Sequence, residues 1–76
     1  MHVQIYTRST CSFCERARRA LERSGIPFRE QSLDQDRRLA QRLLALFGRP
    51  AMPYVLIDGE PLGGVDELEE WLAGEG

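Results

Sequence analysis

The sequence predicts an α/β fold in which three helices flank a four-stranded mixed β-sheet, in the order β-α-β-α-β-β-α. A strand pattern, a helix pattern and a second strand pattern open the chain, and such a βαβ unit has a right-handed crossover and parallel strands. Near the other end, Asp58-Gly59 joins two short strand patterns, which is a strong signal for an antiparallel hairpin. The 76 residues are expected to form a single domain, 1–76.

Residues 2–7 are the first predicted strand and residues 12–23 the first helix. Polar and apolar side chains alternate through the strand, which is the period of a half-buried β-strand. In the helix, small and apolar positions recur at helical spacing, and arginines and glutamates lie between them. The positions expected to face the core are Ala17, Ala20, Leu21 and Ser24. Gly25 and Pro27 then end the helix.

Residues 28–33 are the second predicted strand, and a second helix is expected to begin at Asp34 or Gln35. Its apolar stripe is predicted to comprise Leu39, Leu43, Leu44, Leu46 and Phe47. Gly48 is expected to end this helix, because glycine readily adopts the left-handed conformation of a helix C-terminus.

Residues 54–57 and 60–63 are the two strands of the predicted hairpin. Pro61 lacks an N–H group, and this favours an edge position for the second strand. A last helix is expected over residues 66–73, with Asp66 near its N-cap. Leu68, Trp71 and Leu72 are predicted to face inward.

The composition is that of an ordinary globular domain, with 42% hydrophobic and 29% charged residues. No apolar segment approaches the roughly 20 residues that span a membrane, and the first residues do not resemble a secretory signal, so we expect a cytoplasmic protein. All ten basic residues are arginines within residues 1–49, whereas residues 50–76 hold seven acidic residues. The arginines lack the clustering of a nucleic-acid footprint, and we interpret them mainly as solvated helix faces.

Cys11 and Cys14 are the only cysteines of the chain and define a Cys-x-x-Cys motif at the predicted start of the first helix. A helix N-terminus offers unpaired N–H groups and a partial positive charge. A thiolate there is stabilised, and the pKa of such a thiol can fall from about 8.5 to between ~3.5 and 7.5. We therefore predict that Cys11 is a nucleophile and that Cys14 resolves its mixed disulfide.

Two other interpretations of the cysteine pair are weaker. A structural disulfide that closes so short a loop would constrain little of the unfolded chain. A structural zinc site needs four ligands, whereas the chain offers two cysteines and His2. In a cytoplasmic protein, a Cys-x-x-Cys motif is more often catalytic than structural.

A Cys-x-x-Cys motif directly after the first strand of a βαβ unit is typical of the thioredoxin-like fold. The chain as a whole resembles the glutaredoxins of the small bacterial dithiol type, over about residues 2–73. Three separate segments carry this resemblance. They are Tyr6-Thr7-Arg8-Ser9-Thr10-Cys11-Ser12-Phe13-Cys14, Ala51-Met52-Pro53 and Leu62-Gly63-Gly64-Val65-Asp66-Glu67-Leu68.

The resemblance implies a glutathione-dependent thiol–disulfide oxidoreductase that reduces protein disulfides or protein–glutathione mixed disulfides. It implies catalysis by Cys11 and Cys14, with glutathione as co-substrate. It also implies a monomer without nucleic-acid or membrane partners. The residues expected to bind glutathione are Arg8, Phe13, Arg49, Met52, Pro53, Val65, Asp66 and Glu67.

Each of these residues has an expected task. Pro53 is the candidate cis proline that leaves the backbone of Met52 free to pair with an extended peptide. The acidic side chains of Asp66 and Glu67 would take the amino group of glutathione, while the N-terminus of the last helix takes the γ-glutamyl carboxylate. The arginines would attract the glycine carboxylate, and Arg8 would also favour the Cys11 thiolate. Weaker candidates for that carboxylate are Arg37 and Gln41.

Five residues depart from the family pattern. Arg8, Ser12 and Phe13 stand where most relatives have Lys, Pro and Tyr, Ala51 lacks the usual threonine hydroxyl, and Pro50 removes a backbone N–H just before the binding loop. Some glutaredoxins with serine at the position of Ser12 resemble cluster carriers, so a [2Fe–2S] cluster bound through Cys11 in a glutathione-containing dimer stays open as an alternative. A redoxin reduced by thioredoxin reductase is a second alternative, although the Gly-Gly-x-Asp-Glu pattern argues against it.

Overall fold

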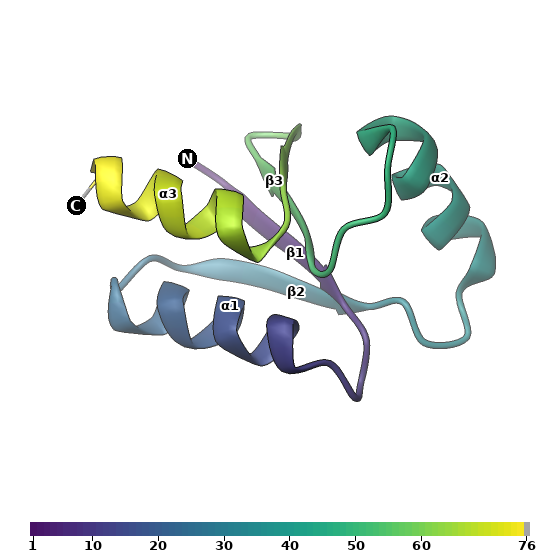
Figure 1. Cartoon of the computed structure of the whole chain (residues 1–76), viewed down its shortest axis with the longest axis horizontal. Helices are drawn as coiled ribbons and strands as arrows, with labels where there is room; N and C mark the ends of the chain where they lie inside the picture. Colours follow the sequence, from purple (N-terminus) through teal and green to yellow (C-terminus); the bar gives the residue numbers. More distant parts are fainter. Residues whose placement is uncertain (76) are drawn as a thin grey trace.

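The structure is a computed structural model that describes residues 1–75, and its centre is a four-stranded sheet in the order β2-β1-β3-β4 (Figure 1). The strands are β1 (Val3–Thr7), β2 (Phe28–Ser32), β3 (Tyr54–Ile57) and β4 (Glu60–Gly63). β1 and β2 run parallel, whereas β3 is antiparallel to both β1 and β4. This arrangement confirms the mixed sheet and the element order that the sequence predicts.

Three helices cover the two faces of the sheet: α1 (Ser12–Arg23), α2 (Arg37–Phe47) and α3 (Val65–Glu75). α1 and α3 lie side by side on one face, where Leu21 and Leu68 are fully buried against β1 and Val55. α2 covers the other face, where Leu43 packs with Tyr54 and Leu56. Because successive side chains of β3 point to opposite faces, this strand contributes to both apolar clusters.

α2 differs from its prediction at its start and in its apolar face. It begins at Arg37 after the N-cap Asp36, whose carboxylate accepts the N–H of Leu39 at 3.2 Å. Gln35 has a φ of 64°, which is incompatible with a right-handed helix, and this excludes the earlier start. Leu44 and Leu46 are exposed rather than buried, because Leu43 and its part-buried neighbours already fill the contact with the sheet.

The other differences are small. Ser24 is exposed and caps the end of α1 with its backbone instead of facing the core. α3 begins one residue earlier than predicted, so Asp66 lies within its first turn rather than at its cap. The hairpin turn is as expected, since Asp58 and Gly59 have φ values of 51° and 80°, the positive values that a type I′ turn requires.

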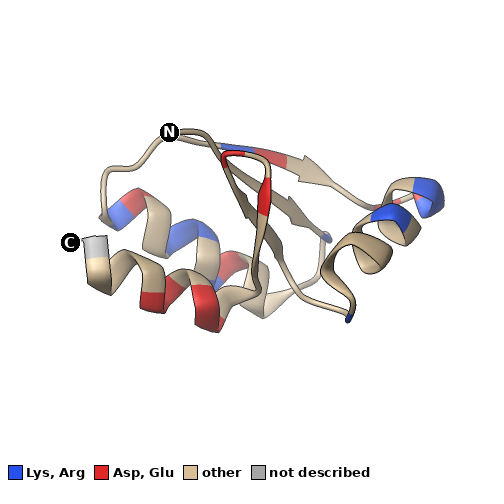
Figure 2. Cartoon of the chain, turned by 90° about the horizontal axis from the view of Figure 1, so that it is seen from above, with Lys and Arg blue, Asp and Glu red and all other residues tan. Residues whose placement is uncertain are grey.

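The charge asymmetry of the sequence has a structural counterpart. Figure 2 shows that acidic α3 lies beside α1, which carries several arginines. Arg16 of α1 bonds Glu69 at 2.8 Å and Asp66 at 3.1 Å, so the two halves of the chain are paired across this helix contact. Among the described residues, no helix is long and apolar enough to cross a membrane.

Candidate redox site

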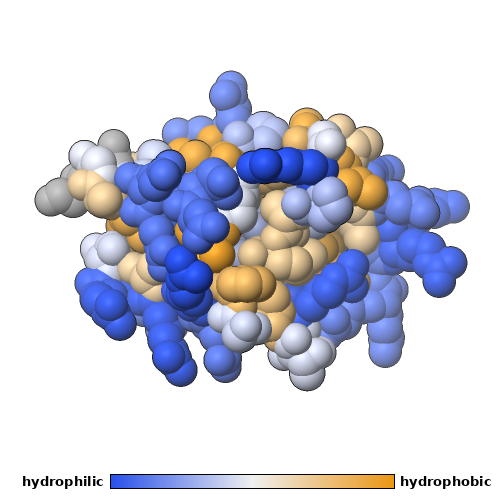
Figure 3. Space-filling view, viewed as in Figure 1, coloured by the Kyte–Doolittle hydropathy of each residue, from blue (hydrophilic) through white to orange (hydrophobic). Residues whose placement is uncertain are grey.

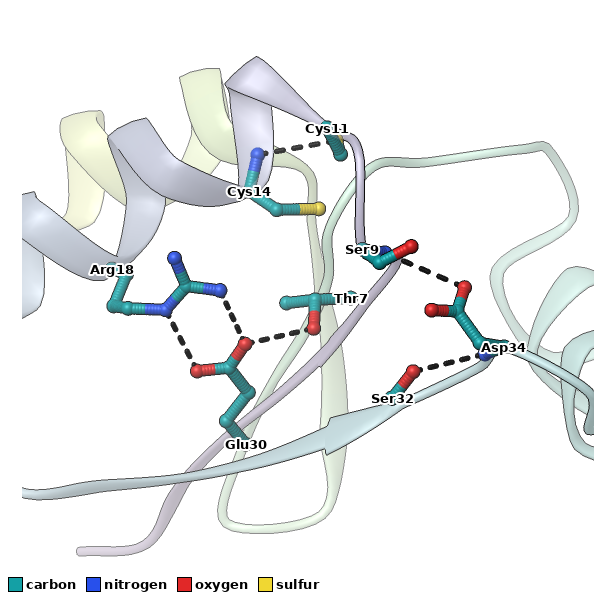
Figure 4. Close-up of polar contacts among 8 residues, drawn as sticks. All are labelled: Thr7, Ser9, Cys11, Cys14, Arg18, Glu30, Ser32 and Asp34. Atoms are coloured by element: carbon teal, nitrogen blue, oxygen red, sulfur yellow. Dashed lines mark hydrogen bonds and ion pairs between the residues drawn. The ribbon is translucent and has the colours of Figure 1, made fainter.

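Cys11 is the N-cap of α1, and the geometry of this helix start gives the two thiols different environments. Its backbone is extended, with φ −137° and ψ 109°, and its sulfur accepts the backbone N–H of Cys14 at 3.2 Å (Figure 4). Cys11 is half-buried, whereas Cys14 is fully buried one turn further along. An incoming disulfide can therefore reach Cys11 from solvent, and Cys14 only through Cys11.

The chemistry of Cys14 follows from this burial. Desolvation, with the hydrogen bond to Cys11 as a second cause, raises the pKa of the Cys14 thiol to about 11. Cys14 therefore stays protonated near neutral pH while Cys11, which accepts an N–H at a helix start, is the sulfur placed to react as a thiolate. Both cysteines are free thiols in this structure.

A hollow of about 470 Å³ lies beside the cysteine pair, between the start of α1, the loop before β3 and the start of α3. Phe13 forms one wall, and its ring is 54% exposed. Six of the residues predicted to bind glutathione line it: Phe13, Arg49, Met52, Val65, Asp66 and Glu67. Figure 3 shows apolar surface near the middle of this face with hydrophilic side chains around it.

The loop before β3 forms the wall of this hollow opposite α1. The Met52–Pro53 peptide bond is cis, as predicted, and Pro53 is buried beneath the hollow rather than lining it. Within the described residues, the backbone N–H and C=O of Met52 have no backbone hydrogen-bond partner. Ala51 and Pro50 also line the hollow, in the loop where the family threonine is missing.

The acidic side chains at the start of α3 are already paired. Glu67 turns back along the helix and accepts the N–H of Gly64 at 2.8 Å, while its other oxygen lies 3.5 Å from Arg49. The Gly64 N–H lowers the pKa of this carboxyl, so it stays ionised. The Glu67 side chain caps α3, a role that the sequence analysis predicted for Asp66.

Arg8 does not line this hollow but a neighbouring one of about 480 Å³. The two weaker candidates, Arg37 and Gln41, line the same second hollow, and Pro50 contributes to both. The predicted site residues are thus divided between two adjoining depressions that meet at the loop before β3.

A polar network behind the cysteines was missed by the sequence prediction, which placed Arg18 on a solvated helix face. Arg18 of α1 bonds the carboxylate of Glu30 on β2 through two nitrogens, one of them at 2.8 Å, and the hydroxyl of Thr7 donates to the same carboxylate at 2.8 Å (Figure 4). Arg18 lowers the pKa of Glu30. The available signal was the register of the parallel strands, in which Glu30 is opposite Ile5 and therefore lies on the same face of the sheet as Thr7, two positions away.

A second polar contact fixes the loop that leads to Cys11. Asp34 accepts the backbone N–H of Ser9 at 3.4 Å, and its own N–H bonds the hydroxyl of Ser32 at 3.0 Å (Figure 4). The hydrogen bonds of Ser9 are the main cause that lowers the pKa of Asp34. Within residues 1–74, no three His, Cys, Asp or Glu side chains gather as a metal site.

A βαβαββα fold with a Cys-x-x-Cys motif at the start of its first helix is that of the thioredoxin-like thiol–disulfide oxidoreductases. The comparisons narrow this class. The glutaredoxin family model matches residues 3–62. Glutaredoxin 3 of Escherichia coli is 34% identical over 67 residues, which cover 88% of this chain and 81% of that protein. The chain belongs to the glutaredoxin family, and its activity is thiol–disulfide exchange.

Two solved structures show the same fold. The solution structure of glutaredoxin from Brucella melitensis has a TM-score of 0.82 at 34% identity, with 100% of this chain and 82% of that chain covered. The glutaredoxin-like NrdH-redoxin of Escherichia coli, described with a thioredoxin-like activity profile, has a TM-score of 0.76 at 29% identity. That match covers 92% of this chain and 93% of the other.

Proposed function

We propose that the protein uses glutathione as its co-substrate and reduces protein disulfides or protein–glutathione mixed disulfides. The observation that carries this proposal is the hollow beside the cysteines, whose lining includes Arg49 and the two acidic residues Asp66 and Glu67 at the start of α3. Glutathione carries a terminal carboxylate at its glycine end and an amino group at its γ-glutamyl end. The lining therefore contains a basic side chain for a carboxylate and acidic side chains for an amino group.

We assign the groups of the tripeptide to the predicted site residues. Asp66 is exposed and receives the amino group, and the first turn of α3, around Val65, receives the γ-glutamyl carboxylate. Met52 pairs with the central cysteine of glutathione through its free backbone groups, which Pro53 positions from below. Phe13 packs against the tripeptide from the opposite wall.

Glutathione's remaining carboxylate goes to the arginine side of the site. Arg49 lines the hollow and lies close to Glu67, so a carboxylate there would compete for the pairing between these two side chains. Arg8 lies across the loop in the second hollow and contributes long-range attraction. This division makes Arg49 the direct partner and Arg8 the more distant one.

The reaction follows the two environments of the thiols. The Cys11 thiolate attacks the sulfur of a disulfide, the S–S bond breaks, and the departing thiolate takes a proton from water. The Cys14 thiol loses its proton and attacks Cys11, which releases the second thiol and leaves a Cys11–Cys14 disulfide. Two glutathione molecules then reduce this disulfide and become glutathione disulfide. With a glutathionylated substrate, glutathione itself can instead attack the mixed disulfide on Cys11.

A coupled assay with glutathione and glutathione reductase tests this proposal on a glutathionylated protein and on a protein disulfide. Cys11→Ser should abolish both reactions, whereas Cys14→Ser should retain the reduction of the glutathionylated protein. Retention of full activity by Cys11→Ser would overturn the assignment. Turnover with thioredoxin reductase and none with glutathione would favour the activity profile described for NrdH-redoxin.

The [2Fe–2S] alternative depends on Cys11, since this half-buried thiol is the only one of the two that a second chain could approach. Such a dimer would bind the cluster through one Cys11 thiolate from each chain together with two glutathione sulfurs. Anaerobic reconstitution with glutathione separates the two functions, because a cluster carrier should give a brown dimer and the oxidoreductase a colourless monomer.

We further propose that residues 1–76 form a single domain that works as a monomer in the cytoplasm, the compartment in which its dithiol form is maintained.

A further inference from the structure

The Arg18–Glu30 pair is bidentate and anchored at both ends, so it holds a positive charge at one place. Arg18 uses two of its nitrogens for the Glu30 carboxylate, and Thr7, which is only 3% exposed, fixes that carboxylate from β1. The third nitrogen of Arg18 has no contact drawn in Figure 4 and points toward the ribbon of α1, the helix that also holds Cys14. A guanidinium fixed in this way loses little freedom when it acts on a neighbouring charge.

Arg18 and Cys14 are four residues apart on α1 and therefore lie on the same helix face, one turn apart. Cys14 is fully buried and Arg18 is partly buried, with 34% of its side chain exposed. A charge pair in this setting is screened less than one on an open surface. Two groups oppose the effect of burial on the pKa of Cys14: a hydrogen bond with the backbone of Arg8, which is the larger effect, and the charge of the Arg18 side chain.

The other charged groups near Cys14 do not duplicate this effect. Cys11 shares the helix turn and disfavours a second thiolate. On β2, the carboxylate of Glu30 is bonded to Arg18 itself. On the side of α3, Asp66 and Glu69 are both bonded to Arg16.

We propose that Arg18, held in position by Glu30 and Thr7, supplies the positive charge that stabilises the Cys14 thiolate during thiol–disulfide exchange. Cys14 carries negative charge in two steps. It attacks the mixed disulfide on Cys11 as a thiolate, with its proton released to solvent, and it leaves as a thiolate when another thiolate attacks Cys11 of the closed Cys11–Cys14 disulfide. Arg18 keeps its own proton throughout.

The two steps are the forward and reverse directions of one exchange, so the loss of Arg18 should slow both. Rates of thiol–disulfide exchange follow the acidity of the attacking and leaving thiols with an exponent of about one half. A nearby opposite charge changes that acidity by about ten- to a hundredfold or more. Arg18→Gln should therefore slow ring closure and ring opening by about three- to tenfold each, and leave the reduction potential at pH 7 unchanged.

An experiment without glutathione isolates the attack of Cys14 on a mixed disulfide at Cys11. Reduced protein reacts with dithiobis(nitrobenzoate) in a stopped-flow instrument. Attack by Cys11 releases one thionitrobenzoate, and attack by Cys14 on the resulting mixed disulfide releases a second. Arg18→Gln should leave the first phase unchanged and slow the second, while Arg18→Lys keeps the charge and should restore the second phase to within about twofold of the wild type.

Arg19→Gln is the matched control, because Arg19 is exposed on the same helix and takes part in none of the ion pairs within the described residues. It should change neither phase. Ring opening is measured separately by reaction of the oxidised protein with dithiothreitol, followed by acid quenching and mass measurement. Equal slowing of both phases in Arg18→Gln, or no slowing of the second, would overturn the proposal.

A charge-swapped variant separates electrostatics from a purely structural contact. Arg18→Glu with Glu30→Arg keeps opposite charges facing each other between α1 and β2, but it puts a carboxylate next to Cys14. The second phase should be slower in this variant than in Arg18→Gln. A second phase at the wild-type rate would show that the pair only joins α1 to β2. Because glutathione takes no part, these results do not depend on whether it is the co-substrate.

Discussion

The two sulfur atoms of the site differ because one helix turn moves a side chain from the surface to the core. Cys11 caps α1 and is half-buried, whereas the pKa of Cys14 is raised to about 11, chiefly by burial. Iodoacetamide should therefore modify Cys11 first, and Cys14 should react only as the pH approaches 11, where its thiolate forms. Mass spectrometry of samples quenched over a pH series measures this. Modification of both cysteines at similar rates at pH 8 would contradict it.

Asp66 is highly exposed and, among the described residues, is paired only with Arg16, which makes it available to a ligand. If it binds the amino group of glutathione, Asp66→Asn should raise the KM for glutathione by about three- to tenfold and leave kcat nearly unchanged, since a charged hydrogen bond at an exposed position is lost. Steady-state kinetics with varied glutathione measures this. Glu70→Gln, an exposed acidic residue of the same helix, is the control and should have no effect.

At the scale of elements, the junction between β4 and α3 depends on a close approach that only glycine allows. Gly63 has a φ of 140°, and a Cβ atom there would lie 2.6 Å from Cγ of Glu67. Gly63→Ala should lower the free energy of unfolding by about 1 to 3 kcal/mol, measured by urea denaturation. Gly74→Ala is the control within α3, because a Cβ there has nothing within 4 Å, and it should leave stability unchanged or slightly raised.

The elements themselves were predictable, because each has a local signal: alternation in β1, helical spacing in α1, and Asp58-Gly59 in the hairpin. The cysteine pair also came from a local motif, whereas the cis proline came from the resemblance to the glutaredoxins. The sequence did not predict the start of α2. Gln35 has a left-handed backbone conformation, but glutamine, unlike glycine, gives no local signal for it.

Contacts between residues far apart in the sequence were harder to predict. The hydrogen bond that the Gly64 N–H donates to Glu67 spans only three residues, but the Arg18–Glu30 contact depends on how α1 packs over β2. A helical wheel places Arg18 among other arginines and cannot distinguish it from them. The same limit applies to the division of Arg8 and Arg49 between two hollows, because both arginines sit in loops whose paths only the folded chain defines.

Over the whole molecule, carboxylates paired with arginines or backbone N–H groups connect stability to pH. Hydrogen bonds from Arg18, with a further one from Thr7, lower the pKa of Glu30 below its ordinary value of 4.5. A carboxyl whose pKa is lower in the folded state contributes stability above its unfolded pKa and loses that contribution as the pH falls through its folded pKa. Acid should therefore weaken the contact between α1 and β2.

Glu30→Gln tests this link, because glutamine has no charge at any pH. At neutral pH the variant should be less stable than the wild type by about 1 kcal/mol or less, since solvent screens a partly exposed pair. This difference should stay constant above about pH 5 and shrink below pH 4.5 as Glu30 of the wild type takes up its proton. Urea denaturation over a pH series measures it, with Glu22→Gln, an exposed carboxylate outside the ion pairs of the described residues, as the control. A difference that persists unchanged to pH 2 would show that the Glu30 charge does not stabilise the fold.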